Sequence, residues 1–96
     1  MGRKSSRKGY RGEKEWADLT GGQRLPRDHR HDVFAEGRFW EVKLRAAGFG
    51  PVYSALEEYE RHARSDDGPP LVAFRQDRKR WVIAHYYGDP CPHVET

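Results

Sequence analysis

Cysteine and long apolar runs are scarce in this sequence of 96 residues. Cys91 is the only cysteine, which excludes an intramolecular disulfide and a four-cysteine zinc site and is typical of a reducing compartment. No stretch approaches the roughly 18 apolar residues that a transmembrane helix needs, and no apolar segment follows the N-terminal charges as in a secretory signal. We therefore expect a cytoplasmic protein, or one in the host cytoplasm if the sequence is viral, with no membrane partner.

Basic residues gather at the N-terminus, although the whole chain has a net charge of only +3. Within residues 1–14, Glu13 is the only acid among the basic residues Arg3, Lys4, Arg7, Lys8, Arg11 and Lys14. Such a segment attracts polyanions by releasing counterions from phosphate, although it could also be a solvated, disordered terminus. We expect a basic arm over residues 1–8, which could become ordered only on DNA, one folded domain over 9–87 and an irregular tail over 88–96.

Apolar spacing predicts a first helix from about Ser6 to Thr20, which Gly21 and Gly22 end. Its inward stripe holds Gly9, Glu13, Trp16 and Leu19–Thr20 at spacings of three and four. The stripe therefore directs the carboxylate of Glu13 toward the domain.

Two runs of strand-forming residues follow, Asp32–Ala35 and Phe39–Arg45, around a predicted Glu36-Gly37 turn. A further strand could precede them. Alternation in the second run places one set of side chains toward the core, Trp40, Val42 and Leu44, and the other set on the opposite face, Phe39, Glu41 and Lys43.

Gly48, Gly50 and Pro51 break the pattern before a second predicted helix, which begins at Val52 and ends before Asp66. Apolar runs over Leu71–Phe74 and Trp81–Tyr86 then predict a hairpin buried on both faces. The order predicts an α/β fold with a small mixed β-sheet and flanking helices. Because so short a chain has a limited core, we also expect a homodimer.

Three acids and a lysine come into one region in this arrangement: Glu13 from the first helix, Asp32 from the first strand, and Glu41 and Lys43 from the second. Oxygen ligands suit hard cations such as Mg²⁺ or Mn²⁺. We predict Asp32 and Glu41 as primary ligands, joined by the backbone carbonyl of Val42 and by Glu13. Residues two apart share a strand face, so Lys43 could orient or deprotonate water beside the metal, or stabilise charge on a phosphate. These residue types fit phosphodiester hydrolysis.

The order of these residues resembles a known nuclease family. The segment Arg7–Trp16 (RKGYRGEKEW), followed by Asp32 and by Glu41-Val42-Lys43, is similar to the archaeal-type Holliday junction resolvases and their viral relatives, within the PD-(D/E)XK nucleases. The similarity spans nearly all of the chain. His31 stands where the class motif has Pro, and the chain is shorter than expected of that family.

This resemblance implies a restriction-endonuclease-like core, Mg²⁺ or Mn²⁺ as cofactor, and a homodimer that resolves four-way DNA junctions by paired phosphodiester hydrolysis. It implies a catalytic set of Glu13, Asp32, Glu41 and Lys43. The DNA-binding candidates are the arm residues Arg3, Lys4, Arg7 and Lys8, together with Arg11, Arg45 and Arg75.

Other interpretations remain open. The chain could cut other branched or linear DNA, or it could be a non-catalytic DNA-binding module in which the acids only cap turns or pair with arginine. His29 and His31 could share a strand face as transition-metal ligands, or could contact DNA. His85 is expected to be a half-buried, partnered residue. Among the tyrosines, Tyr53 could touch substrate but suits a core or interface, and Tyr86 and Tyr87 suit an interface.

Overall fold

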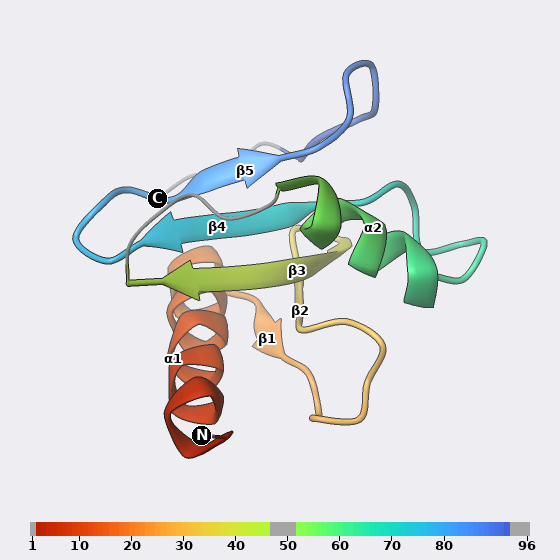
Figure 1. Ribbon diagram of the computed structural model, residues 1–96. Helices are drawn as coiled ribbons and strands as arrows, with labels where there is room; N and C mark the ends of the chain where they lie inside the picture. The colour runs from red at the N-terminus through yellow and green to blue at the C-terminus, as the bar shows by residue number, and fades with distance from the viewer. Residues whose placement is uncertain (1, 47–51, 93–96) are drawn as a thin grey trace.

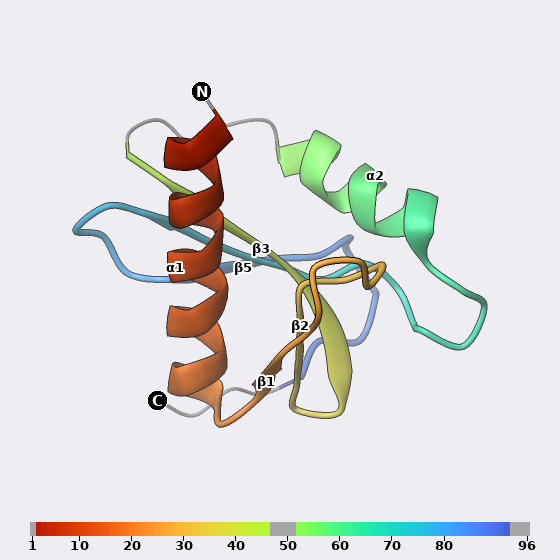
Figure 2. The ribbon, with the colours of Figure 1, turned by 90° about the horizontal axis from the view of Figure 1, so that it is seen from below.

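The chain folds around a five-stranded mixed sheet with one helix against each face (Figures 1 and 2). The computed structural model describes residues 2–46 and 52–92, with side chains from residue 9 onward. The elements in chain order are α1 (Gly2–Thr20), β1 (Gln23–Arg24), β2 (Val33–Ala35), β3 (Arg38–Arg45), α2 (Val52–His62), β4 (Val72–Gln76) and β5 (Val82–Ala84). The predicted α/β class and mixed sheet are confirmed.

The strands lie in the order β1-β2-β3-β4-β5. Strand β3 is parallel to β4, whereas the other three pairs are antiparallel. A parallel pair needs a long crossover connection, which α2 supplies between β3 and β4. Strand β1 is the further strand that, from the sequence, could precede the first hairpin.

The β2–β3 hairpin turns at Glu36-Gly37, as predicted. Both residues adopt positive φ angles, 54° at Glu36 and 74° at Gly37, and the flanking residues Ala35 and Arg38 are paired. Two consecutive left-handed residues form the type of two-residue turn that matches the twist of the strands.

Alternation along the central strands separates two apolar clusters on opposite faces of the sheet. The cluster under α1 contains Trp16, Ala17, Val33, Ala35, Trp40, Val42, Leu71 and Ala73. The cluster under α2 contains Ala55, Leu56, Val72 and Phe74. The predicted inward set of β3 is thus correct, and the opposite face of that strand, with Glu41 and Lys43, lies toward α2.

Helix α1 ends at Thr20, as predicted, but differs from its prediction at its start and in its inward stripe. It begins at Gly2 rather than near Ser6, because the preceding residues have no apolar periodicity to reveal a helix, yet no proline to stop one. At the other end, Leu19 is exposed and does not join the inward stripe. Gly12 is buried instead, and a Cβ there would lie only 2.8 Å from the Cβ of Leu44.

The final hairpin is less buried than predicted. Strand β4 is buried over Val72–Phe74, but β5 is a short edge strand in which Val82 is exposed. Within the described residues, β5 pairs with β4 alone, at the edge of the sheet. The expectation of a half-buried His85 is wrong, because this residue is exposed.

The tyrosines expected at an interface or in the core lie on the surface to different degrees. Tyr53 is largely exposed, so it has no core role. Tyr86 and Tyr87 follow β5 rather than close it, and Tyr87 is fully exposed. Residues 88–92 contain no helix or strand, as predicted for the tail. The chain break at Gly48, Gly50 and Pro51 lies outside the described residues.

In the described part of the chain, no helix is both long enough and apolar enough to cross a membrane.

Candidate active site

Asp32 lies where β2 separates from β3. The ladder between the two strands ends at the pair Val33 and Trp40. One residue earlier, the carboxylate Oδ2 of Asp32 accepts a hydrogen bond of 2.9 Å from the backbone N–H of Val42. The side chain of Asp32 thus bonds to the backbone of β3 just beyond the end of the ladder, and β2 begins at Val33 rather than at the predicted Asp32.

The backbone carbonyl of Val42 points toward the same side as Asp32. Beside the parallel ladder, the N–H of Glu41 donates to the carbonyl of Leu71, the residue just before β4, at 2.9 Å. Alternate residues of a strand bond to the same neighbour, so the N–H and C=O of Val42 face away from β4. This arrangement puts the predicted carbonyl ligand next to the Asp32 carboxylate.

Glu41 is a buried acid whose carboxyl group is only partly hydrogen-bonded. Its residue is only 5% exposed, and its Oε1 has no hydrogen-bond partner among the described residues. Burial and the nearby charges of Asp32 and Glu58 raise the pKa of Glu41 to about 9. Because an unpaired buried charge is costly, this carboxylate is suited to receive a proton or a cation.

Lys43 lies two residues beyond Glu41 on the same strand face. Its Nζ is 2.9 Å from Oε1 of Glu58 on α2. Burial raises the pKa values of Glu13, Asp32 and Glu41, and the charge of Lys43 opposes that rise in all three. The same charge helps to lower the pKa of Glu58. Lys43 is therefore the central cation of the acidic cluster.

Glu58 is a site residue that the sequence analysis missed. Burial acts to raise the pKa of Glu58, but its hydrogen bond with Lys43 and the charge of Lys43 outweigh burial, so the pKa is lowered. Glu58 also shares a hydrogen bond with Glu41. Its only sequence signal is its position on α2 next to the buried Tyr59, and α2 packs on β3.

Glu13 reaches the cluster from α1, as predicted. Burial and the charge of Asp32 raise its pKa, against the effect of Arg24, whose Nε is 3.0 Å from Oε1 of Glu13. Burial likewise raises the pKa of Asp32, despite the hydrogen bond from Val42 and the charge of Lys43. The structure thus places the four predicted residues in electrostatic contact.

An open groove of about 470 Å³ connects these side chains. It is lined by Gly9, Glu13, Asp32, Glu41, Val42, Lys43, Leu44, Arg45, Ala46 and Glu58. All the predicted catalytic residues therefore line one groove. We name this space the acidic groove.

The residues of the acidic groove fit a hard divalent cation. Within the described residues, no three His, Cys, Asp or Glu side chains are already arranged as a metal-binding group. Mg²⁺ commonly uses only one or two carboxylates, with waters and substrate phosphate completing its shell. Asp32 and Glu41 can supply two such ligands and the Val42 carbonyl a third, and the unpartnered Oε1 of Glu41 is the observation that favours this use.

His31 lies inside the protein and contacts a buried acid. Its side chain is fully buried, and its Nε2 is 2.9 Å from Oδ2 of Asp67. Asp67 also accepts two hydrogen bonds of 2.8 Å from Arg30 and one of 2.9 Å from the backbone of Arg64. The side chain of His31 is therefore held by Asp67 inside the protein, and Asp67 is a buried residue of this network that the sequence did not reveal.

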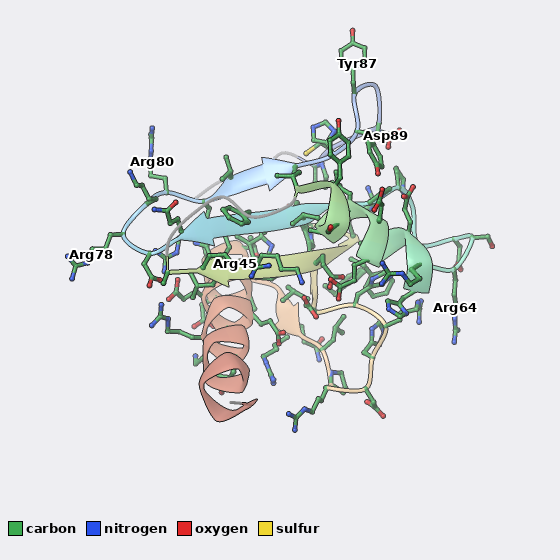
Figure 3. All side chains as sticks on the ribbon, in the orientation of Figure 1. Arg45, Arg64, Arg78, Arg80, Tyr87 and Asp89 are labelled. Carbon is green, nitrogen blue, oxygen red and sulfur yellow. The ribbon has the colours of Figure 1, made fainter. Side chains whose placement is uncertain are left out.

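The basic residues expected to bind DNA have different surroundings. Arg45 is exposed at the end of β3. Arg75 is paired with Glu15 at 2.8 Å, and Arg11 with Asp77 at 2.9 Å. Side chains of the arm residues Arg3, Lys4, Arg7 and Lys8 lie outside those described. Figure 3 adds Arg78 and Arg80, which project from the β4–β5 turn at the opposite end of the sheet from Arg64.

A scan against protein-family models, a search of curated proteins and a search of solved structures each found no match to this chain. A function is therefore proposed from the residue pattern and the geometry of the groove.

Proposed function

We propose that the chain is a metal-dependent, structure-specific DNA endonuclease of the PD-(D/E)XK class, with a restriction-endonuclease-like core, that resolves four-way junctions by paired phosphodiester hydrolysis. The observation that carries the proposal is the buried carboxylate of Glu41, whose Oε1 has no partner among the described residues. It stands in electrostatic contact with Asp32 and Lys43. A charged carboxylate in that position is costly unless it takes up a proton or a cation joins it.

Asp32, Glu41 and the Val42 carbonyl would hold Mg²⁺ or Mn²⁺, with Glu13 at the margin of the site. The bound cation would act as a Lewis acid on the scissile phosphate. The hydrogen bond from Val42 to Asp32 fixes the orientation of that carboxylate on β3.

Lys43 supplies the positive charge that the protein itself brings to the reaction. Its ion pair with Glu58 keeps the ammonium group at the groove rather than in open water. From there it can donate a hydrogen bond to a phosphate oxygen as negative charge develops on it. Glu13, whose pKa is raised by burial and by the charge of Asp32, would serve as a proton acceptor beside the cation.

The remaining parts of the proposal concern the DNA and the assembly. The basic arm, Arg45 and the other arginines would contact backbone phosphates, which gives affinity without base readout. A homodimer would present two acidic grooves to symmetric strands of a junction. The short edge strand β5 and the exposed Tyr87 leave surface for such an assembly. The proposed compartment is the cytoplasm, or the host cytoplasm for a viral protein.

The decisive experiment compares an immobile four-way junction with a linear duplex of the same arm sequence, each with Mg²⁺ or with a chelator. The proteins are the wild type, Asp32→Asn and the control Asp66→Asn, which changes an exposed aspartate outside the groove. We expect symmetric paired nicks on the junction with Mg²⁺, which are lost with chelator and in Asp32→Asn and retained in Asp66→Asn.

Each other outcome changes one part of the proposal. Equal cutting of junction and duplex would retain the nuclease and remove the junction preference. Binding without cutting under every metal condition would replace the enzyme by a non-catalytic DNA-binding module. Cleavage by Asp32→Asn at the wild-type rate would overturn the assignment of the active site.

A further inference from the structure

A second open groove, of about 650 Å³, adjoins the acidic groove. It lies between α1 and the connection from β1 to β2, and its walls include Tyr10, Arg24 and Arg27. The two grooves share Gly9, Glu13 and Asp32 as lining residues. They are therefore continuous past the candidate active site. We name this second space the Tyr10 groove.

An aromatic ring and a guanidinium group are stacked in the wall of the Tyr10 groove. The guanidinium carbon of Arg24 lies 4.4 Å from the centroid of the Tyr10 ring, and Tyr10 remains 50% exposed. The ion pair of Arg24 with Glu13 fixes the orientation of the guanidinium. Nucleobases stack favourably on aromatic rings and on guanidinium planes, regardless of base identity.

Gly9 is a further sign that something approaches this wall closely. A glycine inside a helix costs roughly 1 kcal/mol relative to alanine. For Gly12 the reason is the close approach of Leu44, but a Cβ on Gly9 would meet no atom within 4 Å. Packing within the described chain therefore does not explain why residue 9 is a glycine. Its position where the two grooves meet does explain it.

We propose that the Tyr10 groove binds an unpaired nucleotide of the DNA strand next to the scissile phosphate, with its base stacked on the Tyr10–Arg24 pair. This inference rests on the proposed nuclease function and names the feature of its substrate. The strand passes Gly9, where the missing side chain leaves room for the backbone. Arg24 and Arg27 provide positive charge for the adjoining phosphates.

The stacking site gives a physical basis for structure specificity. Bases in the middle of a duplex must lose stacking and pairing before they can enter the groove. Bases at a branch point lose less, so DNA with unstacked nucleotides is favoured over linear duplex. The selection depends on local distortion and not on sequence, because every base has a π face.

A fluorescent base tests this binding mode directly. A four-way junction carries 2-aminopurine at the branch point or, as a control, well inside one arm, and all proteins carry Asp32→Asn so that DNA is bound without being cut. In this background we compare Tyr10→Ala, the conservative Tyr10→Phe, and Tyr87→Ala. Tyr87 is a matched control because it is fully exposed and projects from the loop after β5 (Figure 3).

We expect the branch-point fluorescence to change on binding, by stacking, with Tyr10 intact, with Tyr10→Phe and with Tyr87→Ala, and not with Tyr10→Ala. The affinity of Tyr10→Ala for the junction should fall roughly tenfold or more. The arm probe should not respond. An equal response by Tyr10→Ala, or none with Tyr10 intact, would overturn the proposal.

Gly9→Leu gives an independent test that does not remove a stacking group. Leucine favours helix and meets no neighbour at its Cβ, so the melting temperature should be equal or higher while junction affinity falls several-fold. Wild-type affinity in a folded Gly9→Leu protein would count against the groove. If Tyr10 and Gly9 variants bind normally while Mg²⁺-dependent cutting of DNA persists in the Asp32-containing protein, the nuclease stands and only the stacking site fails.

Discussion

Lys43 on β3 and Glu58 on α2 form an ion pair with Nζ and Oε1 2.9 Å apart. Because the protonated carboxyl of Glu41 also donates a hydrogen bond to Glu58, one residue of the crossover helix contacts both members of the Glu-x-Lys pattern. Helix α2, which connects the parallel strands β3 and β4, thereby also holds Glu41 and Lys43 in the candidate active site.

Glu58→Gln should reduce the affinity of the site for divalent cations. The change removes one negative charge and releases Lys43, which can then pair with Glu41 in the place of a cation. We expect the Mg²⁺ concentration for half-maximal cleavage to rise several-fold, with unfolding free energy altered by less than about 1 kcal/mol because the pair is partly exposed. Glu57→Gln, an exposed neighbour on α2, is the matched control. Identical Mg²⁺ titrations of both variants would contradict this role.

Glu41 should make the metal-free protein less stable as pH rises. Its native pKa is about 9 against an ordinary value of 4.5, so between these values the native state binds more protons than the unfolded state. Unfolding free energy therefore falls with rising pH in that window. Glu41→Gln should flatten the dependence and gain on the order of 2 kcal/mol near its upper end. Urea titrations across pH with chelator measure both slopes.

Mg²⁺ should stabilise the wild type, and more so at higher pH, since cation and proton compete for Glu41. A ligand at 100 times its dissociation constant stabilises by about 2.7 kcal/mol. Thermal melting with Mg²⁺ or chelator should show this shift for the wild type and little of it for Glu41→Gln. An equal Mg²⁺ shift in the two proteins would place the cation elsewhere.

Asp67→Asn should destabilise the fold strongly, because Asp67 is buried and joins Arg30, His31 and the backbone of Arg64. Removing one partner of a buried ionic network leaves the others uncompensated, at a cost of roughly 3–5 kcal/mol. The adjacent Asp66 is exposed, and Asp66→Asn should change the unfolding free energy by less than about 0.5 kcal/mol. Equal urea midpoints for the two variants would remove the anchoring role.

His31 should make the protein less stable in acid. Burial lowers the pKa of His31 from its ordinary 6.5, against the opposing effect of Asp67. The unfolded state therefore binds more protons as pH falls through 6.5, and stability decreases. His31→Gln should lower stability at pH 7 but flatten this slope, whereas exposed His85→Gln should retain it. The pH dependence of the melting temperature distinguishes them.

Local rules in the sequence predicted the parts of the fold that depend on neighbours along the chain. Strand period placed Trp40 and Val42 in the core and Glu41 with Lys43 on the other face, and residue type predicted the Glu36-Gly37 turn. The same rules failed for β5, because its exposure depends on how far the helices cover the sheet. They also failed at the start of α1, where polar residues extend a helix without an apolar stripe.

The sequence by itself therefore determined the catalytic candidates, their order and the strand face that Glu41 and Lys43 share, because alternation along a strand is a local property. Only the tertiary structure decided that Glu58 joins Lys43, that Asp67 holds His31 and that Arg24 stacks on Tyr10 beside Glu13. Each of these contacts joins residues far apart in the chain. Their distances follow from the packing of helices on the sheet, which no local spacing encodes.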